Sequence, residues 1–189
     1  MANGLANAIP AEVAASPVAT SGHIIREPTT AAERFASLEM TFQPQIAAIL
    51  AELRTAGYNP IIASAWRSIP TQLQLFAAGK SKVKFSFHNN TEPDGTAAAL
   101  AADIVDRKLL WEFSEANAAF FKALGAAAYA RGCHWGGSVR SGFSQQPPWR
   151  TYGLSWDPSH VQARANAELA RLRLVNLQRF AVAAAVRPG

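Results

Sequence analysis

An aspartate inside the small, apolar run ALAADIVD constrains the fold more than any other feature of the chain. Asp103 has alanine and isoleucine as its immediate neighbours, so an ordinary packed fold buries it. A buried carboxylate without a partner is very unfavourable, because the charged form loses its hydration. The chain must therefore fold so that a cationic group, a hydrogen-bond donor or a metal ion meets Asp103.

The composition indicates one ordinary globular domain. The chain has 189 residues, of which 49% are hydrophobic, enough for a real core. Its single cysteine, Cys133, excludes an intrachain disulfide and a cysteine-rich structural zinc site. Cys133 lies in ARGCHWGG and is better explained as a small buried side chain than as a nucleophile. No stretch approaches the roughly 18 apolar residues of a membrane span, so we expect no membrane insertion.

The net charge of +5 fits either an anionic partner or a solvated helix face. The basic residues are scattered, although arginines are more frequent in the last third. Aromatic residues are not interleaved with Lys and Arg as on a nucleic-acid-binding surface, so we expect no nucleic-acid partner. An anionic cell-wall polymer stays open as a partner.

The first 28 residues are expected to form a flexible arm, and residues 29–189 a single domain. The arm is rich in Ala, Pro, Asn and Ser, and it has neither a basic region nor a solid apolar region at its start. It therefore does not resemble a secretory signal. We expect synthesis in the cytoplasm without a recognisable signal peptide.

Hydrophobic periodicity and capping residues predict an α+β fold with a small, mainly antiparallel sheet flanked by helices. Thr30 and Glu33 have the spacing of a capping box at the start of the first helical segment, and Pro44 is expected to kink or split that segment. The expected helices are 30–57, 69–80, 114–132 and 163–186, and the expected strands are 60–66, 82–88, the second half of 97–106, 133–137 and 156–162, with an irregular loop at 138–155.

Two histidines and Asp103 form a candidate metal site. His88 ends one expected strand, and His160 lies in WDPSH beside Asp157. Two imidazoles and one carboxylate with an open fourth position are a common catalytic zinc set. Asp157 is a candidate general base near the open position. Taken singly, a core or surface histidine and an ordinary Asp-Pro turn are the alternatives.

Four motifs in order along the chain resemble the M15 family of zinc peptidases, which act on bacterial peptidoglycan. They are SAWRS (64–68), SFHN…ALAADIVD (86–106), HWGG (134–137) and WDPSH (156–160). The resemblance implies a hedgehog/DD-peptidase-like fold and a Zn²⁺ ion held by His88, Asp103 and His160. It also implies Asp157 as the catalytic carboxylate. Arg67 would bind a substrate carboxylate or polarise the scissile carbonyl.

The spacing of the first two ligands departs from the family pattern. Many members have a compact S-x-H-x-x-G-x-A-x-D motif, whereas fifteen positions separate His88 from Asp103. An Asp94-Gly95 turn could close an enlarged loop between them. Asp94 is a rival ligand but has the context of a turn residue. Asp106, the other rival, points to the opposite strand face from Asp103.

The Asp-x-x-His form of the last motif resembles the endolysin-type L-alanyl-D-glutamate endopeptidases, whereas the carboxypeptidases usually carry Glu-x-x-His. We therefore expect a peptidoglycan peptidase that hydrolyses an L-Ala-D-Glu bond of the stem peptide. The alternatives are a D-Ala-D-Ala carboxypeptidase of the same family and a non-catalytic, zinc-stabilised binding module.

The expected partners follow from the same resemblance. They are peptidoglycan stem peptides, and also an immunity protein if the chain is an exported antimicrobial toxin rather than a phage lysin. We expect a monomer that acts on the cell wall after release or dedicated export. Gly136 and Gly137 are expected to let backbone approach a peptide substrate, and His134 is a weaker candidate for stabilising charge.

Overall fold

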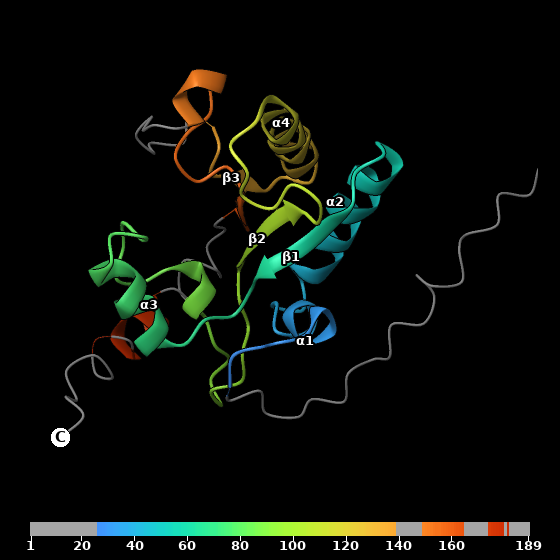
Figure 1. The fold of residues 1–189 in the computed structure, drawn as a ribbon. Coiled ribbons are helices and arrows are strands. Elements are labelled where there is room, and N and C mark those ends of the chain that lie inside the picture. Colours follow the sequence, from blue (N-terminus) through green and yellow to red (C-terminus); the bar gives the residue numbers. More distant parts are fainter. Residues whose placement is uncertain (1–25, 139–148, 165–173, 180, 182–189) are drawn as a thin grey trace, which may run out of the picture.

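The computed structural model describes residues 26–138, 149–164, 174–179 and 181 (Figure 1). The expected arm up to residue 25, most of the loop at 138–155 and most of the last expected helix lie outside these residues, although 174–179 are helical. None of the described helices is long and apolar enough to cross a membrane. The elements are α1 (Ala31–Ala36), α2 (Gln43–Thr55), β1 (Pro60–Ser64), α3 (Ile69–Ala77), η1 (Phe87–Asn89, a 3₁₀ helix), β2 (Ala101–Asp106), α4 (Glu115–Ala130), β3 (His134–Trp135), η2 (Trp149–Tyr152, a 3₁₀ helix) and β4 (His160–Gln162).

The strands form one antiparallel sheet in the order β1-β2-β4-β3, which confirms the α+β prediction. Strand β2 pairs with β1 from Pro60 opposite Asp106, and a register shift follows Ile62. On its other side β2 pairs with β4, and Asp103 lies directly opposite His160. The sheet thus places two of the expected ligands on adjacent central strands.

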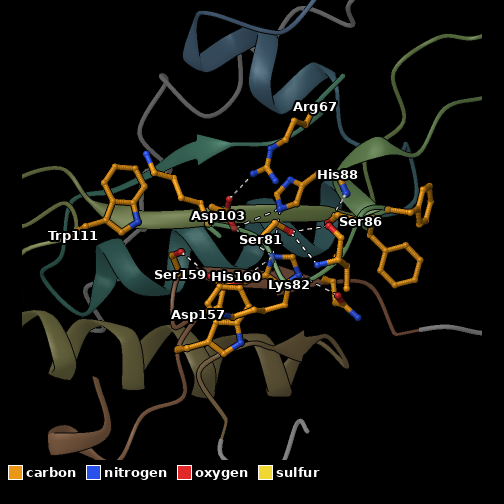
Figure 2. A pocket seen from close by; sticks show the side chains of 16 residues that line it. Arg67, Ser81, Lys82, Ser86, His88, Asp103, Trp111, Asp157, Ser159 and His160 are labelled. Carbon is orange, nitrogen blue, oxygen red and sulfur yellow. Dashed lines mark hydrogen bonds and ion pairs between the residues drawn. The ribbon is translucent and has the colours of Figure 1, made fainter. Parts of the chain in front are cut away.

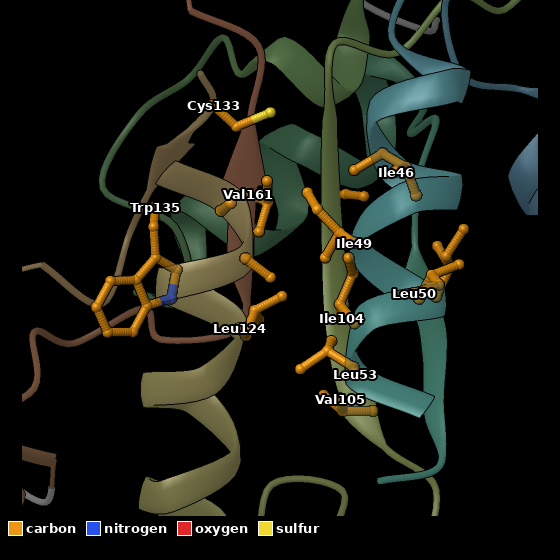
Figure 3. Close-up of a cluster of buried hydrophobic side chains, with 14 of the residues drawn as sticks. Ile46, Ile49, Leu50, Leu53, Ile104, Val105, Leu124, Cys133, Trp135 and Val161 are labelled. Carbon is orange, nitrogen blue, oxygen red and sulfur yellow. The ribbon is translucent and has the colours of Figure 1, made fainter. Parts of the chain in front are cut away.

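Helices α2 and α4 pack against one face of the sheet and form the hydrophobic core with it (Figure 3). Side chains alternate along a strand, so Ala102 and Ile104 point into this core and Asp103 points to the other face. Each fully buried Leu or Ile side chain stabilises the fold by about 1.5–3 kcal/mol. The labelled core residues in Figure 3 are Ile46, Ile49, Leu50, Leu53, Ile104, Val105, Leu124, Cys133, Trp135 and Val161.

The predicted helix ends are set by local capping. The Thr30 hydroxyl accepts from Glu33 N, and the Glu33 carboxylate accepts from Thr30 N, as the capping box requires. Pro44 lies in the first turn of α2, so the expected helix over 30–57 is split into α1 and α2. Ser114 caps α4 by accepting from Asn117 N. These ends agree with the sequence prediction.

The predicted strand over 82–88 is wrong. No strand is assigned there, and residues 87–89 form η1 instead. The Ser86 hydroxyl and the Asn89 side chain cap this turn reciprocally. The carbonyl of Val83 accepts from the Gln72 side chain, and that of Phe87 from Leu100 N. Side chains and a loop contact therefore satisfy these backbone groups. The segment can keep its alternating apolar residues without pairing to a neighbouring strand.

Candidate metal centre

His88 is held between η1 and the segment that follows β1. Its backbone N–H points to the Ser86 hydroxyl at 3.4 Å, and its carbonyl accepts from Arg67 N at 2.8 Å. Its ring Nδ1 lies 2.5 Å from the carbonyl oxygen of Ala65. The side chain is 2% exposed. Backbone and ring are therefore both fixed by the SAWRS segment, which precedes His88 by about twenty positions in the sequence.

The long insertion between His88 and Asp103 folds into a small loop with closed ends. Thr91 and Ala97 form an antiparallel bridge, and Ala98 N donates to Asn90 O at 3.1 Å. Gly95 turns the loop with a φ of +92°, a conformation that favours glycine. The two ends of the insertion therefore lie close together. The expected closure of the loop by an Asp94-Gly95 turn is confirmed.

His88, Asp103 and His160 converge in front of the sheet (Figure 2). His88 Nε2 lies 3.4 Å from Asp103 Oδ1, and His160 Nδ1 lies 3.3 Å from the same oxygen. The two ring nitrogens are 3.3 Å apart. Tetrahedral ligands with bonds of about 2.0–2.1 Å have neighbouring donor atoms about 3.3–3.4 Å apart. The three atoms, called the metal centre below, therefore fit three vertices around a zinc-sized cation.

The outer nitrogens of both rings point to oxygen acceptors. The carbonyl of Ala65 can only accept, so His88 Nδ1 carries the proton and Nε2 is bare. His160 Nε2 lies 3.0 Å from Gln162 Oε1, which favours a proton on Nε2 and a bare Nδ1. Oxygen partners on the far ring nitrogen are the usual way to orient a histidine that binds a metal. With a cation bound, both rings can thus turn a lone pair toward it beside Asp103.

The electrostatics of the metal centre favour a positive charge at its middle. Burial opposes the charge of Asp103, yet the two histidines hold its pKa well below the usual range. Burial lowers the pKa of His88, which is therefore neutral. Burial alone would also lower the pKa of His160, but Asp103, Asp157 and Gln162 raise it to about 9. In the metal-free chain a proton supplies the charge that a bound cation would replace.

Asp157 lies beside the metal centre at the rim of the same pocket. Its Oδ2 is 4.0 Å from His160 Nδ1, and its backbone carbonyl accepts from His160 N at 3.2 Å. Burial raises the pKa of Asp157 to about 6, and the charge of Asp103 acts in the same direction. A carboxyl group with a pKa near neutrality can both accept and return a proton at physiological pH.

Arg67 contacts the metal centre from behind Asp103. Its Nη2 donates to Asp103 Oδ2 at 3.2 Å and to the Ser64 hydroxyl at 3.1 Å. Its Nη1 donates to Gln72 Oε1 at 2.9 Å, and Gln72 is fully buried. Asp103 can therefore present one oxygen to the metal centre while the other is held by a guanidinium. The structure brings Arg67 to the pocket, and its predicted contact with substrate stays a prediction.

The rival ligands lie outside the metal centre. Asp94 Oδ1 accepts from Thr96 N at 2.9 Å within the insertion loop. Asp106 accepts from backbone N–H groups of Asn59, Lys108 and Leu109 at the end of β2. His134 is exposed on β3 and is not among the residues that line the pocket. The choice of Asp103 over both aspartates agrees with this placement.

Two glycines have a different role from the one expected. A Cβ on Gly136 would lie 2.5 Å from Asp157 O, and one on Gly137 would lie 2.2 Å from the indole of Trp135. Gly136 N also donates to His160 O at 2.8 Å. Both glycines therefore make room for neighbouring residues of the chain itself. They are not explained by the approach of a peptide substrate.

The metal centre opens into a cleft of about 450 Å³. Trp111 and Trp156 contribute to its lining, together with Lys80 and Lys82 from the loop after α3. The sequence prediction missed Gln162, which follows His160 by two positions and so lies on the same strand face. It also missed Trp111 and the two lysines, because no motif connects them to the ligands along the chain.

Comparison with known proteins gives structural matches alone. No protein-family model matches the chain, and no curated protein matches it in sequence. The structure is similar to that of the L-Ala D-Glu endopeptidase ChiX from Serratia marcescens, with a TM-score of 0.46 and 18% identity over 71% of this chain and 86% of that one. The chain is similar in structure to M15-family peptidases.

Two further solved structures belong to the same comparison. VanYB in complex with D-alanine-D-alanine matches with a TM-score of 0.43 and 14% identity over 80% of this chain and 84% of that one. The LD-carboxypeptidase LdcB matches with a TM-score of 0.42 and 15% identity over 75% of this chain and 64% of that one. At these sequence identities the comparison shows similarity of the fold alone.

Proposed function

We propose that the chain is a zinc-dependent peptidase that hydrolyses an amide bond of the peptidoglycan stem peptide, with L-Ala-D-Glu as the bond. The observation that carries this proposal is the metal centre, whose three donor atoms have the mutual distances of a tetrahedral site. The neighbouring Asp157 supplies a carboxyl group that such a hydrolase needs. The four motifs that resemble M15 peptidases support the choice of substrate.

His88, Asp103 and His160 would hold the zinc ion, which supplies a Lewis acid that activates water and polarises the scissile carbonyl. Asp157 accepts a proton from the attacking water and returns it to the leaving amine. Arg67 orients Asp103 through their 3.2 Å contact. The walls of the cleft exclude solvent from one side of the peptide.

The L-Ala-D-Glu bond is favoured over D-Ala-D-Ala by the Asp-x-x-His form of the last motif. We further propose that the enzyme acts on the cell wall after release or dedicated export, as a lysin or an antimicrobial toxin.

The test is digestion of purified peptidoglycan by zinc-loaded protein, followed by mass spectrometry of the released muropeptides. Loss of the bond between L-Ala and D-Glu supports the proposal, and loss of a terminal D-Ala supports the carboxypeptidase alternative. Zinc-dependent binding to peptidoglycan without any cleavage would instead indicate a binding module. A chelator-treated sample controls for contaminating hydrolases.

A further inference from the structure

The wall of the cleft beside the metal centre carries positive charge that the ligands do not use. The acidic residues among those that line the cleft are Asp103 and Asp157, and both belong to the reaction site. Arg67 is paired with Asp103. Lys80 and Lys82 form no ion pair with a carboxylate within the described part of the chain. Their charge is therefore available to a ligand.

The loop 80–83, which carries these lysines, is fixed from the core side. Gln72 Nε2 donates to Ser81 Oγ at 2.9 Å and to Val83 O at 2.7 Å. Lys80 N and Ser81 N both donate to Leu75 O, at 2.8 and 3.1 Å. Gln72, which also orients Arg67, thus holds the Ser81 hydroxyl and the Val83 carbonyl on either side of Lys82. This loop is a preorganised part of the cleft.

The Lys82 ammonium group also has a defined neighbour. Its Nζ lies 5.8 Å from the centre of the Trp156 ring, within the range of a cation–π contact. Trp156 directly precedes Asp157, the proposed general base. The Lys82 side chain is exposed to solvent. Lys82 therefore presents a solvated cation at the cleft wall, next to the segment that carries the reaction.

We propose that Lys82, assisted by Lys80, forms a cationic subsite that binds a carboxylate of the peptide substrate and so selects acidic stem peptides over amidated ones. This inference rests on the proposed function and names the chemical class of its substrate. A lysine ammonium attracts a carboxylate as a compact point charge, and among the described residues neither Lys80 nor Lys82 is paired with a carboxylate of the cleft. Lys82 acts on binding and leaves the chemical step to Asp157.

The test uses a synthetic stem pentapeptide that contains both the L-Ala-D-Glu and the D-Ala-D-Ala bond. Two further versions carry a carboxamide in place of one carboxylate, at the D-Glu residue or at the C-terminus. The zinc-loaded wild type and the variants Lys82→Gln, Lys82→Arg and Lys84→Gln are compared. Lys84 is the matched control, because its Nζ lies over the Phe76 ring at 5.6 Å and it does not line the cleft.

For the wild type, one of the two amidations is expected to raise KM about tenfold, with kcat little changed. Lys82→Gln is expected to raise KM for the acidic peptide by the same factor. It should also abolish the difference in KM between the acidic peptide and the amidated peptide to which the wild type responds. Lys82→Arg keeps most of the difference, and Lys84→Gln keeps all of it. The difference also shrinks as salt is added, because the pair is solvent-exposed.

Equal effects of Lys82→Gln on acidic and amidated peptides, or a wild type indifferent to both amidations, would overturn the subsite while leaving the peptidase intact. If the zinc-loaded wild type cleaves none of the peptides, the proposed function fails. The affinity of each peptide, measured by titrating it into the protein and following tryptophan fluorescence, then tests the subsite separately. Loss of affinity on amidation in the wild type but not in Lys82→Gln supports it, and equal affinities refute it.

Discussion

Replacement of Gln162 tests whether the outer hydrogen bond of a histidine controls the metal centre. Gln162 Oε1 lies 3.0 Å from His160 Nε2 and is the polar group that favours a bare Nδ1 facing Asp103. Gln162→Leu removes this acceptor while keeping a side chain of similar size. The imidazole then loses one hydrogen bond in a site where its own side chain is 9% exposed.

The expected magnitude comes from that single contact. A hydrogen bond to a buried polar group contributes about 1–3 kcal/mol when its partner is left unsatisfied, and 1.4 kcal/mol is a factor of ten in affinity. Loss of an outer partner of a metal-binding histidine weakens metal binding by about 10- to 100-fold. The two estimates agree, so Gln162→Leu should bind Zn²⁺ about 10- to 100-fold more weakly than the wild type.

The assay is competition for Zn²⁺ with a chelator of known affinity, on the full chain. Gln74→Leu is the control for the same chemical change, because Gln74 is exposed on α3. Gln162→Glu retains an acceptor and adds a negative charge, so it should bind Zn²⁺ at least as tightly as the wild type. Near-ultraviolet circular dichroism verifies that each variant is folded. Equal zinc affinities for Gln162→Leu and Gln74→Leu would refute the reasoning, since His160 would then hold its orientation without the bond.

Three other substitutions have defined outcomes. Asp157→Asn should retain zinc in the same competition and lower kcat on peptidoglycan by at least about 100-fold, since it removes the proton acceptor; an active variant would contradict the role of Asp157. Asp106 is buried, which opposes its charge, but three backbone N–H groups outweigh this and hold its pKa below the usual range. Asp106→Asn should therefore lower the free energy of unfolding by about 2–3 kcal/mol at pH 7, whereas Asp94→Asn should change it little. A depressed carboxyl pKa stabilises the fold above the unfolded value of about 4, so the deficit of Asp106→Asn should close as the pH falls from about 4 toward the folded pKa; a constant difference in urea unfolding would argue against it. Gly125→Ala places a Cβ 2.4 Å from the indole of Trp135, so thermal unfolding should show a net loss of about 1–3 kcal/mol despite the better helix propensity of alanine.

Much of the fold was predictable because its signals are local. Thr30, Ser114 and Pro44 act through contacts within one or two helical turns, and all three mark helix boundaries as expected. The strand predicted at 82–88 failed for the opposite reason. Its alternation matched a half-buried strand, but in the part of the chain that the structure describes the segment has Gln72 and the η1 cap as partners and pairs with no strand.

The candidate site was predictable in its members and not in its contacts. Asp103 stands out in sequence because its neighbours are apolar, and His160 because Asp157 precedes it at a turn spacing. Neither pattern reveals that Ala65 O orients His88 or that Gln162 orients His160. These partners carry no distinctive residue pattern, and a backbone carbonyl carries none at all.

The sequence by itself determined that Asp103, among apolar neighbours, must meet a cationic group, a hydrogen-bond donor or a metal ion, because a buried carboxylate without a partner is very unfavourable. Only the tertiary structure decided which groups meet it. The antiparallel pairing of β2 with β4 sets His160 opposite Asp103, and the closed insertion loop returns His88 to the same face. The cleft wall with Lys82 also comes from a distant segment held by Gln72. Contacts between segments so far apart depend on chain packing, which no local pattern encodes.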